Sequence, residues 1–343
     1  MIPLFKVNMS PEAPAAVEEV LRSGYIGEGS KAAELEARLS TLFAHEAVLT
    51  NSCTSAIDLA LHMIGVGPGD EVVTTPITCT ATNSPIVTRG ARPVWADVDP
   101  STGLIDPVDA RKKCGYRTKA IMAVDWGGAP CDWSALKRIG PPVIEDAAHA
   151  PLTPHGGDYV CYSFGPIKHF TCGDGGALLC PSPSRARLLR WYGLDRSSVA
   201  SFRCAQDISE AGYKYHMNDI NAAIGLANSR LLPLAVERHR ANAAWYNENV
   251  RNVLKPCPSV ESSWWLYTIR VGDRAQFIRN MAEEGIEVGQ VHRRNDVHPA
   301  FDFPSGPLPG VDSFDKSNCA IPVGWWLSEE DREKIARAVE VCA

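Results

Sequence analysis

Short apolar runs alternate with helix-like stretches over most of the chain, and this alternation is the strongest constraint on its fold. Several runs are apolar without a strict two-residue period, which is typical of strands covered by helices on both faces. Strands are predicted over residues 47–50, 71–75, 93–98, 119–124, 142–145, 159–164 and 177–180. Strands that alternate with helices predict an α/β fold with a mostly parallel sheet.

The pattern changes near residue 218. Helices are predicted over 220–231 and 237–250, and mixed strand and helix signals follow them. Residues 302–310 are rich in proline and glycine and predict a loop, whereas Ser328, with Asp331 three residues later, predicts the cap of a closing helix. The 343 residues suit two domains at roughly 150 residues each. We therefore predict a large domain over 1–235 and a small C-terminal domain over 236–343.

Composition excludes several classes of protein. The chain has 34 lysines and arginines against 40 acidic residues, a net charge of −6, and no basic run, which argues against nucleic-acid binding. Its apolar runs are far shorter than the ~20 residues that cross a bilayer. The first residues lack a signal-peptide pattern, and none of the 11 cysteines shows CxxC spacing. We expect a cytoplasmic protein with reduced thiols, no metal and no membrane contact.

Lys168 lies between a predicted strand and a glycine-rich segment that leads into the next strand. A lysine that tight backbone holds near a strand end is partly desolvated. Desolvation lowers the pKa of the amine and makes it a nucleophile toward aldehydes. A lysine taken at random is usually a surface residue, but the surrounding pattern favours the nucleophile.

Two further segments carry candidate chemistry. Asp146 ends an apolar run and is followed by small residues. Sites in parallel sheets form at the carboxyl ends of strands, and a carboxylate there can hold the protonated ring nitrogen of pyridoxal phosphate. The alternative is that Asp146 caps a helix. Residues 51–56 place small hydroxylated side chains at a helix start, where free amides bind phosphate, although serine and threonine are also common caps.

In this order, the three segments resemble the DegT/DnrJ/EryC1/StrS family of pyridoxal-phosphate-dependent sugar aminotransferases. The family pattern SFxxxKxxTxGEGG is matched at Ser163, Phe164, Lys168, Thr171, Gly173, Gly175 and Gly176, with Asp174 for glutamate. The family's EDAAQA motif appears over 145–150 with His149 for glutamine, and its GYxYxMxD segment appears over 212–219. The resemblance covers nearly the whole chain. It implies the fold type I architecture, with a mostly parallel seven-stranded sheet in a large domain and a smaller C-terminal α+β domain.

The resemblance also implies roles for single residues. Lys168 would bond to the cofactor and later move a proton between cofactor and substrate carbons. Asp146 would bind the pyridine nitrogen, and His149 would lie near the phenolic oxygen. The further cofactor contacts implied are Cys53, Thr54, Ser55, Cys79, Ser163 and Lys214. Because the family's GYxYxM segment reaches into the neighbouring subunit, Lys214 would act across the interface of a homodimer with shared active sites.

Some positions depart from the family pattern. Cys79 stands where the family has an aromatic residue that stacks on the cofactor, so less stacking area is expected. Asp125 replaces a histidine near the substrate, and His216 replaces arginine or asparagine. The substrate contacts predicted are Tyr25, Asp125, His216, Arg293, Arg294 and His298.

Residues 291–299 concentrate cations where the family contacts nucleotide sugars. Arginine suits a pyrophosphate, and a solvated loop paired with nearby acids is the alternative. Four tryptophans, at positions 264, 265, 325 and 326, can stack on a nucleotide base, but a place in the core or an interface is favoured for them.

The function implied is transfer of an amino group from L-glutamate, through the pyridoxamine phosphate form of the cofactor, to a keto-sugar. The acceptor implied is a nucleotide-linked 4-keto-6-deoxyhexose or a 3-keto sugar, and a cyclitol ketone stays open. Two alternatives remain. Some relatives dehydrate sugars and carry histidine in place of the lysine, whereas a regulatory protein would keep the fold without turnover. The presence of Lys168, Asp146 and Ser163 favours the aminotransferase.

Overall fold

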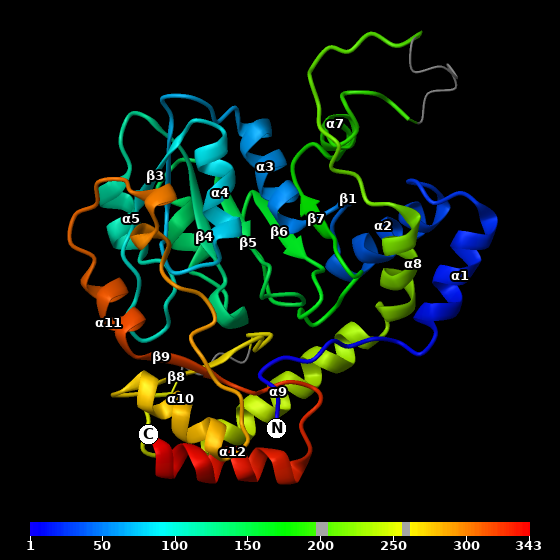
Figure 1. Cartoon of the computed structure of the whole chain (residues 1–343). Helices are drawn as coiled ribbons and strands as arrows, with labels where there is room; N and C mark the ends of the chain where they lie inside the picture. Colours follow the sequence, from blue (N-terminus) through cyan, green and yellow to red (C-terminus); the bar gives the residue numbers. More distant parts are fainter. Residues whose placement is uncertain (197–204, 256–260) are drawn as a thin grey trace.

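The computed structural model describes residues 1–196, 205–255 and 261–343, and it places the seven predicted strands in one sheet (Figure 1). The strands are β1 (Ala47–Thr50), β2 (Glu71–Thr74), β3 (Arg92–Trp95), β4 (Thr118–Val124), β5 (Val143–Asp146), β6 (Tyr159–Ser163) and β7 (Gly176–Leu179). Their order is β1-β7-β6-β5-β4-β2-β3. The two pairs that include β7 are antiparallel and the other four are parallel. The prediction of a mostly parallel seven-stranded sheet is confirmed.

Helices cover both faces of the sheet. The helices of this part are α1 (Ala13–Ser23), α2 (Ser30–Phe43), α3 (Cys53–Ile64), α4 (Thr80–Thr88), α5 (Pro107–Lys113), α6 (Trp133–Lys137), α7 (Pro183–Leu189) and α8 (Asp219–Asn228). Of these, α1 packs against α8 at the outer edge and not on the sheet (Figure 1). No helix in the three described ranges is both long enough and apolar enough to cross a membrane.

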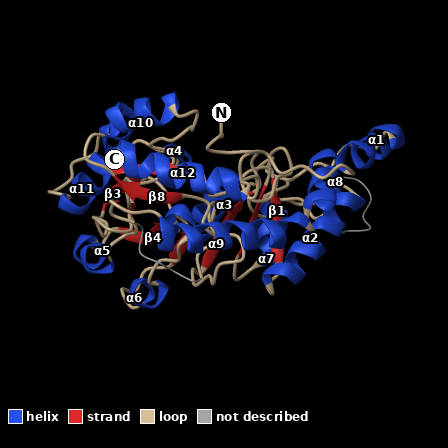
Figure 2. Cartoon of the chain, turned by 90° about the horizontal axis from the view of Figure 1, so that it is seen from below, coloured by secondary structure: helices blue, strands red, loops and turns tan. Residues whose placement is uncertain are grey.

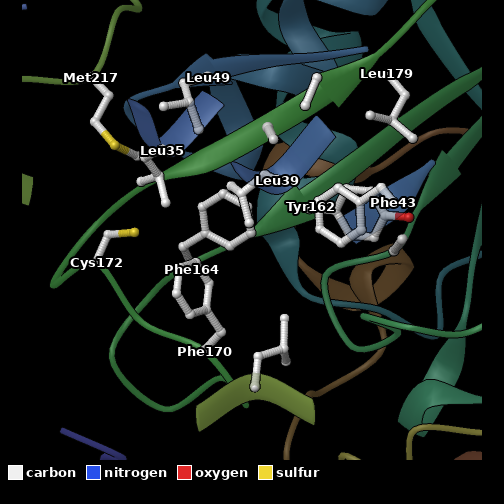
Figure 3. Close-up of a cluster of buried hydrophobic side chains, with 14 of the residues drawn as sticks. Leu35, Leu39, Phe43, Leu49, Tyr162, Phe164, Phe170, Cys172, Leu179 and Met217 are labelled. Carbon is white, nitrogen blue, oxygen red and sulfur yellow. The ribbon is translucent and has the colours of Figure 1, made fainter. Parts of the chain in front are cut away.

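Side chains of each strand alternate between two buried cores. In β6, Val160 and Tyr162 belong to the core under α2, whereas Cys161 belongs to the core under α3 and α4. Figure 3 shows the first of these cores, in which the ring of Phe43 from α2 stacks on Tyr162 with centroids 4.2 Å apart. Burial on both faces explains why the strands are apolar without strict alternation.

The C-terminal part is built around a third core. Its elements are α9 (Leu231–Asn249), β8 (Tyr267–Arg270), α10 (Arg274–Glu283), α11 (Pro309–Ser317), β9 (Asn318–Ile321) and α12 (Glu329–Cys342). Strands β8 and β9 form an antiparallel pair, covered by α10 and α12 (Figure 2). The Ser328 hydroxyl accepts from the Asp331 amide at 3.0 Å, and the Asp331 carboxylate accepts from the Ser328 amide. This reciprocal cap confirms the predicted start of the closing helix.

Helix α9 belongs to two cores. Leu232 and Val236 pack into the core under α2, whereas Ala243 and Tyr246 pack into the C-terminal core. In Figure 1 the helix runs from beneath the sheet to the C-terminal part. The predicted domain boundary at residue 235 therefore falls inside a continuous helix.

Two element boundaries differ from the predictions. Helix α8 ends at Asn228 and α9 begins at Leu231, so the break lies earlier than predicted. Pro233 is compatible with this start because it occupies the first turn of α9, where a helix needs no amide donor. Likewise, Pro309 begins α11, so the predicted loop over 302–310 ends at residue 308.

Candidate active site

Lys168 and Asp146 meet beyond the carboxyl ends of the parallel strands. Asp146 is the last residue of β5, and Lys168 lies in the loop from β6 to β7. Backbone hydrogen bonds fix this loop, from the Phe164 amide to Gly175 (2.8 Å) and from the Cys172 amide to Phe164 (3.0 Å). The structure thus brings together the two residues on which the sequence interpretation depends.

The amine of Lys168 lies in a crowded, mostly apolar setting. Its Nζ is 3.7 Å from the ring centroid of Trp265. Burial lowers the pKa of Lys168 to about 8, although the nearby negative charge of Asp146 and the thiols of Cys53 and Cys79 oppose the shift. At pH 7 a pKa of about 8 leaves roughly a tenth of the amine neutral and nucleophilic, far more than for an ordinary lysine with a pKa of about 10.4.

Asp146 is a buried carboxylate with neutral donors around it. Its Oδ2 accepts from Thr82 Oγ1 at 2.7 Å, and its Oδ1 accepts from the Ala148 amide at 3.0 Å. Burial raises the pKa of Asp146, and the Thr82 hydrogen bond opposes that rise. None of the ion pairs between described residues includes Asp146. A bound cation, such as a protonated ring nitrogen, would stabilise its charged form.

The N-terminus of α3 lies beside this pair. Ser52 is the N-cap, and its hydroxyl accepts from the Ser55 amide at 3.1 Å. That contact occupies the Ser55 amide, which was predicted to bind phosphate, so the amides of Cys53 and Thr54 are the donors that the first turn leaves for an anion. A side chain at Gly176 would collide with the Cys53 amide, since its Cβ would lie 2.6 Å away. The glycine therefore lets β7 pass close under the helix start.

His149 completes the group. Its ring stacks on Trp265 with centroids 3.9 Å apart and lies parallel to His292 at 5.8 Å. Burial, followed by the charge of Lys168, holds the pKa of His149 well below its usual range. Its Nδ1 is buried without a hydrogen-bond partner in the described part of the chain. A neutral imidazole with an unused nitrogen fits contact with a ligand oxygen.

These groups together fit pyridoxal phosphate. Asp146 provides a carboxylate for the ring nitrogen, Lys168 an amine that can bond to the aldehyde, and α3 two amides for the phosphate. Ser163 Oγ accepts from the Gly165 amide at 3.4 Å, which leaves its own proton to donate. Cys79 is the N-cap residue of α4 and lies near enough to affect the pKa of Lys168.

Asp125 does not face this group. Its Oδ1 accepts from the Cys131 amide at 3.0 Å. Burial and then the charge of Glu145 raise the pKa of Asp125 well above its usual range. Because successive strand residues point to opposite faces, Glu145 and Asp146 face opposite ways, and Asp125 lies on the Glu145 side. The structure therefore places Asp125 on the side of Glu145, away from the Asp146 carboxylate.

Tyr25, His216 and Lys214 also lie apart from Lys168 within one chain. The Tyr25 hydroxyl donates to the Glu28 carbonyl at 3.2 Å, and the residue lines a cavity of about 710 Å³. His216 packs its ring 3.8 Å from Trp191, which lines the same cavity. The side chain of Lys214 is exposed.

The cationic residues of the segment over 291–299 lie in different surroundings. Arg294 is held by Asp296 at 2.6 Å and by Asp312, so it is an ion-paired structural residue as the alternative interpretation described. Arg293 is exposed, and His298 is half-buried. The segment reaches the site through His292 instead, whose ring faces His149.

Sequence reasoning missed three residues of the site. Thr82, which donates to Asp146, lies three residues after Cys79 and was not among the predicted contacts. His292 begins the cationic segment but was not selected. Trp265 was considered for a nucleotide base or the core, whereas its ring lies against Lys168 and His149. No pattern in the sequence separates Trp265 from its neighbour Trp264.

Comparisons with known proteins agree with this geometry. The model of the DegT/DnrJ/EryC1/StrS aminotransferase family matches residues 8–340. The crystal structure of AtS13 from Actinomadura melliaura is 41% identical with a TM-score of 0.94, covering 99% of this chain and 98% of that one. The sugar aminotransferase CalS13 from Micromonospora echinospora is 36% identical with a TM-score of 0.92, covering 99% and 100%.

A more distant structure bears on the cofactor. The putative sugar aminotransferase Spr1654 from Streptococcus pneumoniae, in its PLP form, is 26% identical with a TM-score of 0.90 and covers 100% of this chain and 99% of that one. The same protein has also been solved in its PMP form. The two forms are those expected of a cofactor that gains and loses an amino group.

Proposed function

Because the chain belongs to the DegT/DnrJ/EryC1/StrS aminotransferase family and is a pyridoxal-phosphate-dependent sugar aminotransferase, we propose that it moves an amino group from L-glutamate to a nucleotide-linked keto-sugar. The acceptor we propose is a 4-keto-6-deoxyhexose, or else a 3-keto sugar. The observation that carries the proposal is the Lys168 amine, with its pKa lowered to about 8, close to the buried Asp146 carboxylate.

Each residue of the site has a distinct part in this proposal. When bound, pyridoxal phosphate supplies an electron sink for the carbon that loses its proton. Asp146 would hold the ring nitrogen in its protonated form, and Cys53, Thr54 and Ser163 would hold the phosphate. Lys168 in its neutral form would accept the proton from one carbon and return it to another, which is general acid–base catalysis by a single group.

The absorption spectrum of the purified protein, recorded before and after addition of L-glutamate, tests the donor. We expect the visible band of the lysine-linked cofactor to disappear and the band of pyridoxamine phosphate to grow, because glutamate would leave its amino group on the cofactor. D-glutamate is the matched control and should leave the spectrum unchanged. A visible band that persists in saturating L-glutamate would contradict the proposed donor.

The choice of a nucleotide-linked sugar rests on the segment that contains His292. Arg293 follows His292 directly and is exposed. Arg294, in contrast, is partly buried and held in an ion pair with Asp296. Guanidinium groups bind phosphate oxygens in a bidentate way. A nucleotide diphosphate at this position would extend from the site toward solvent.

We also propose a homodimer in which Lys214 serves the partner's site. Tyr213 Oη lies 2.7 Å from His62 Nδ1, and Tyr215 Oη donates to Asp58 at 2.9 Å, so both tyrosines hold the segment against α3. Their rings stack with centroids 4.6 Å apart. Since neighbours alternate in extended backbone, Lys214 points away from α3 and is exposed. This arrangement presents a cation outward, where a phosphate of another subunit can meet it.

Replacing Lys214 with alanine is expected to weaken cofactor retention about 10-fold or more, because a hydrogen bond to a charged group contributes about 1.5–3 kcal/mol. The measurement is the dissociation constant of pyridoxal phosphate by equilibrium dialysis, with the molar mass followed by light scattering. Lys214→Arg should retain most of the affinity, and Lys119→Ala, at an exposed position on β4, should behave as the native protein. A monomeric form with full activity would contradict the shared site.

A further inference from the structure

Trp265 reaches the active site from the C-terminal part of the chain. It lies two residues before β8, and its side chain is 3% exposed. Its Nε1–H donates to the Ile167 carbonyl at 3.0 Å, and the amide of the next residue, Leu266, donates to Gly127 at 3.2 Å. These contacts fix the indole against the loop that carries Lys168.

Three groups surround the indole ring. Phe5 stacks on it with centroids 5.0 Å apart, His149 stacks at 3.9 Å, and the Lys168 Nζ lies 3.7 Å from its centroid. A cation at this distance from an indole is attracted by the electron-rich face of the ring, and the attraction is stronger where water is excluded. The hydrogen bond to Ile167 and the stacked rings thus fix the indole, and the Lys168 amine contacts its face.

We propose that Trp265 is a positioning residue that docks the free ammonium of Lys168 whenever this lysine is not bonded to the cofactor. The inference rests on the function proposed above for Lys168. That function requires the lysine to be released and then to act as a base at nearby carbons. A released lysine otherwise has many rotamers, and docking on Trp265 keeps Nζ at one place beside Asp146.

The interaction predicts a shift that can be measured on the protein without cofactor. Contact with the ring favours the charged amine, so weakening this contact lowers the pKa of Lys168 further. The other titratable groups that act on the lysine, or on which it acts, are Asp146, Cys53, Cys79, His149, His169 and His292. Two of them contact the indole, since His149 stacks on it at 3.9 Å and His292 at 6.4 Å. Burial lowers the pKa of both imidazoles, so they stay neutral where Lys168 titrates and fluorination adds no charge beside the amine.

The experiment replaces Trp265 by 5-fluorotryptophan and by 5,7-difluorotryptophan, which weaken the cation–π contact with little change of shape. The pKa of Lys168 is obtained in the cofactor-free full chain by competitive acetylation at a series of pH values and mass spectrometry of its peptide. We expect stepwise lowering with fluorination, of about half to one and a half units in total, given the usual strength of such contacts. The matched control is the same series at Trp325, where Lys6 lies 5.6 Å from the ring.

An unchanged or raised pKa in the Trp265 series would overturn the docking role. A lowering of equal size in the Trp325 series would overturn it as well. The spectrum with L-glutamate separates this failure from failure of the proposed function: a native protein that responds to L-glutamate keeps its function even if fluorination leaves Lys168 unaffected. Trp265→Phe keeps a weaker aromatic face, so the pKa of Lys168 in this variant should lie between those of the native protein and the difluorotryptophan protein.

Discussion

Alanine at position 168 is expected to lower amino transfer at least about 10⁴-fold, because one side chain supplies both the nucleophile and the base. The measurement is the rate of the half-reaction with L-glutamate, followed by absorbance. In the native protein the same rate should rise as the pH increases through about 8, since the amine loses its proton there and only the neutral form accepts one.

Lys119→Ala is the control for this substitution, because Lys119 is exposed on β4 and far along the strand from its carboxyl end. It should retain the native rate. Normal turnover by Lys168→Ala would show that another group is the nucleophile, and it would remove the basis of the site described above.

Asparagine at position 146 is expected to lower amino transfer about 10²- to 10⁴-fold. It keeps the shape and the contact with Thr82 but removes the charge that would stabilise a protonated ring nitrogen, and breaking a buried charged pair costs about 3–5 kcal/mol. The affinity for pyridoxal phosphate should fall with it. Both quantities can be measured, the rate by absorbance with L-glutamate and the affinity by equilibrium dialysis.

The matched control is Asp302→Asn, which removes a carboxylate from an exposed loop. Thr82→Val gives a graded comparison: it leaves the charge of Asp146 but removes the donor at 2.7 Å, so a smaller loss is expected. If Asp146→Asn bound the cofactor and reacted as the native protein does, Asp146 would have only a structural role, such as the helix cap considered from the sequence.

The sheet was predictable because most of its strands are buried on both faces, the edge strand β3 being the exception. Each of the seven strands is a short apolar run between polar turns, and local composition alone identifies such runs. Lys168 and Asp146 were predictable for a related reason. Each follows a strand, and the carboxyl ends of parallel strands meet at one edge of a sheet.

Contacts between distant segments were not predictable in the same way. Trp265 lies 97 positions after Lys168 in the chain and meets it only because the C-terminal part packs against the loop of residues 163–176. Asp125 shows a second limit. Its place in a motif was clear, but the side of the sheet that it faces depends on strand phase, and a single position cannot reveal that phase.

Helix α9 limits how this chain can be recombined with its relatives. Leu232 and Val236 at one end complete the core under α2, and Ala243 and Tyr246 at the other end complete the C-terminal core. In a chimera joined at residue 235, the start of α9 would come from one protein and pack on the sheet domain of that protein. The rest of α9 would come from the other protein and pack on its β8–β9 pair. An exchange of the C-terminal part therefore has to transfer α9 whole, together with the residues of the sheet domain that receive Leu232 and Val236.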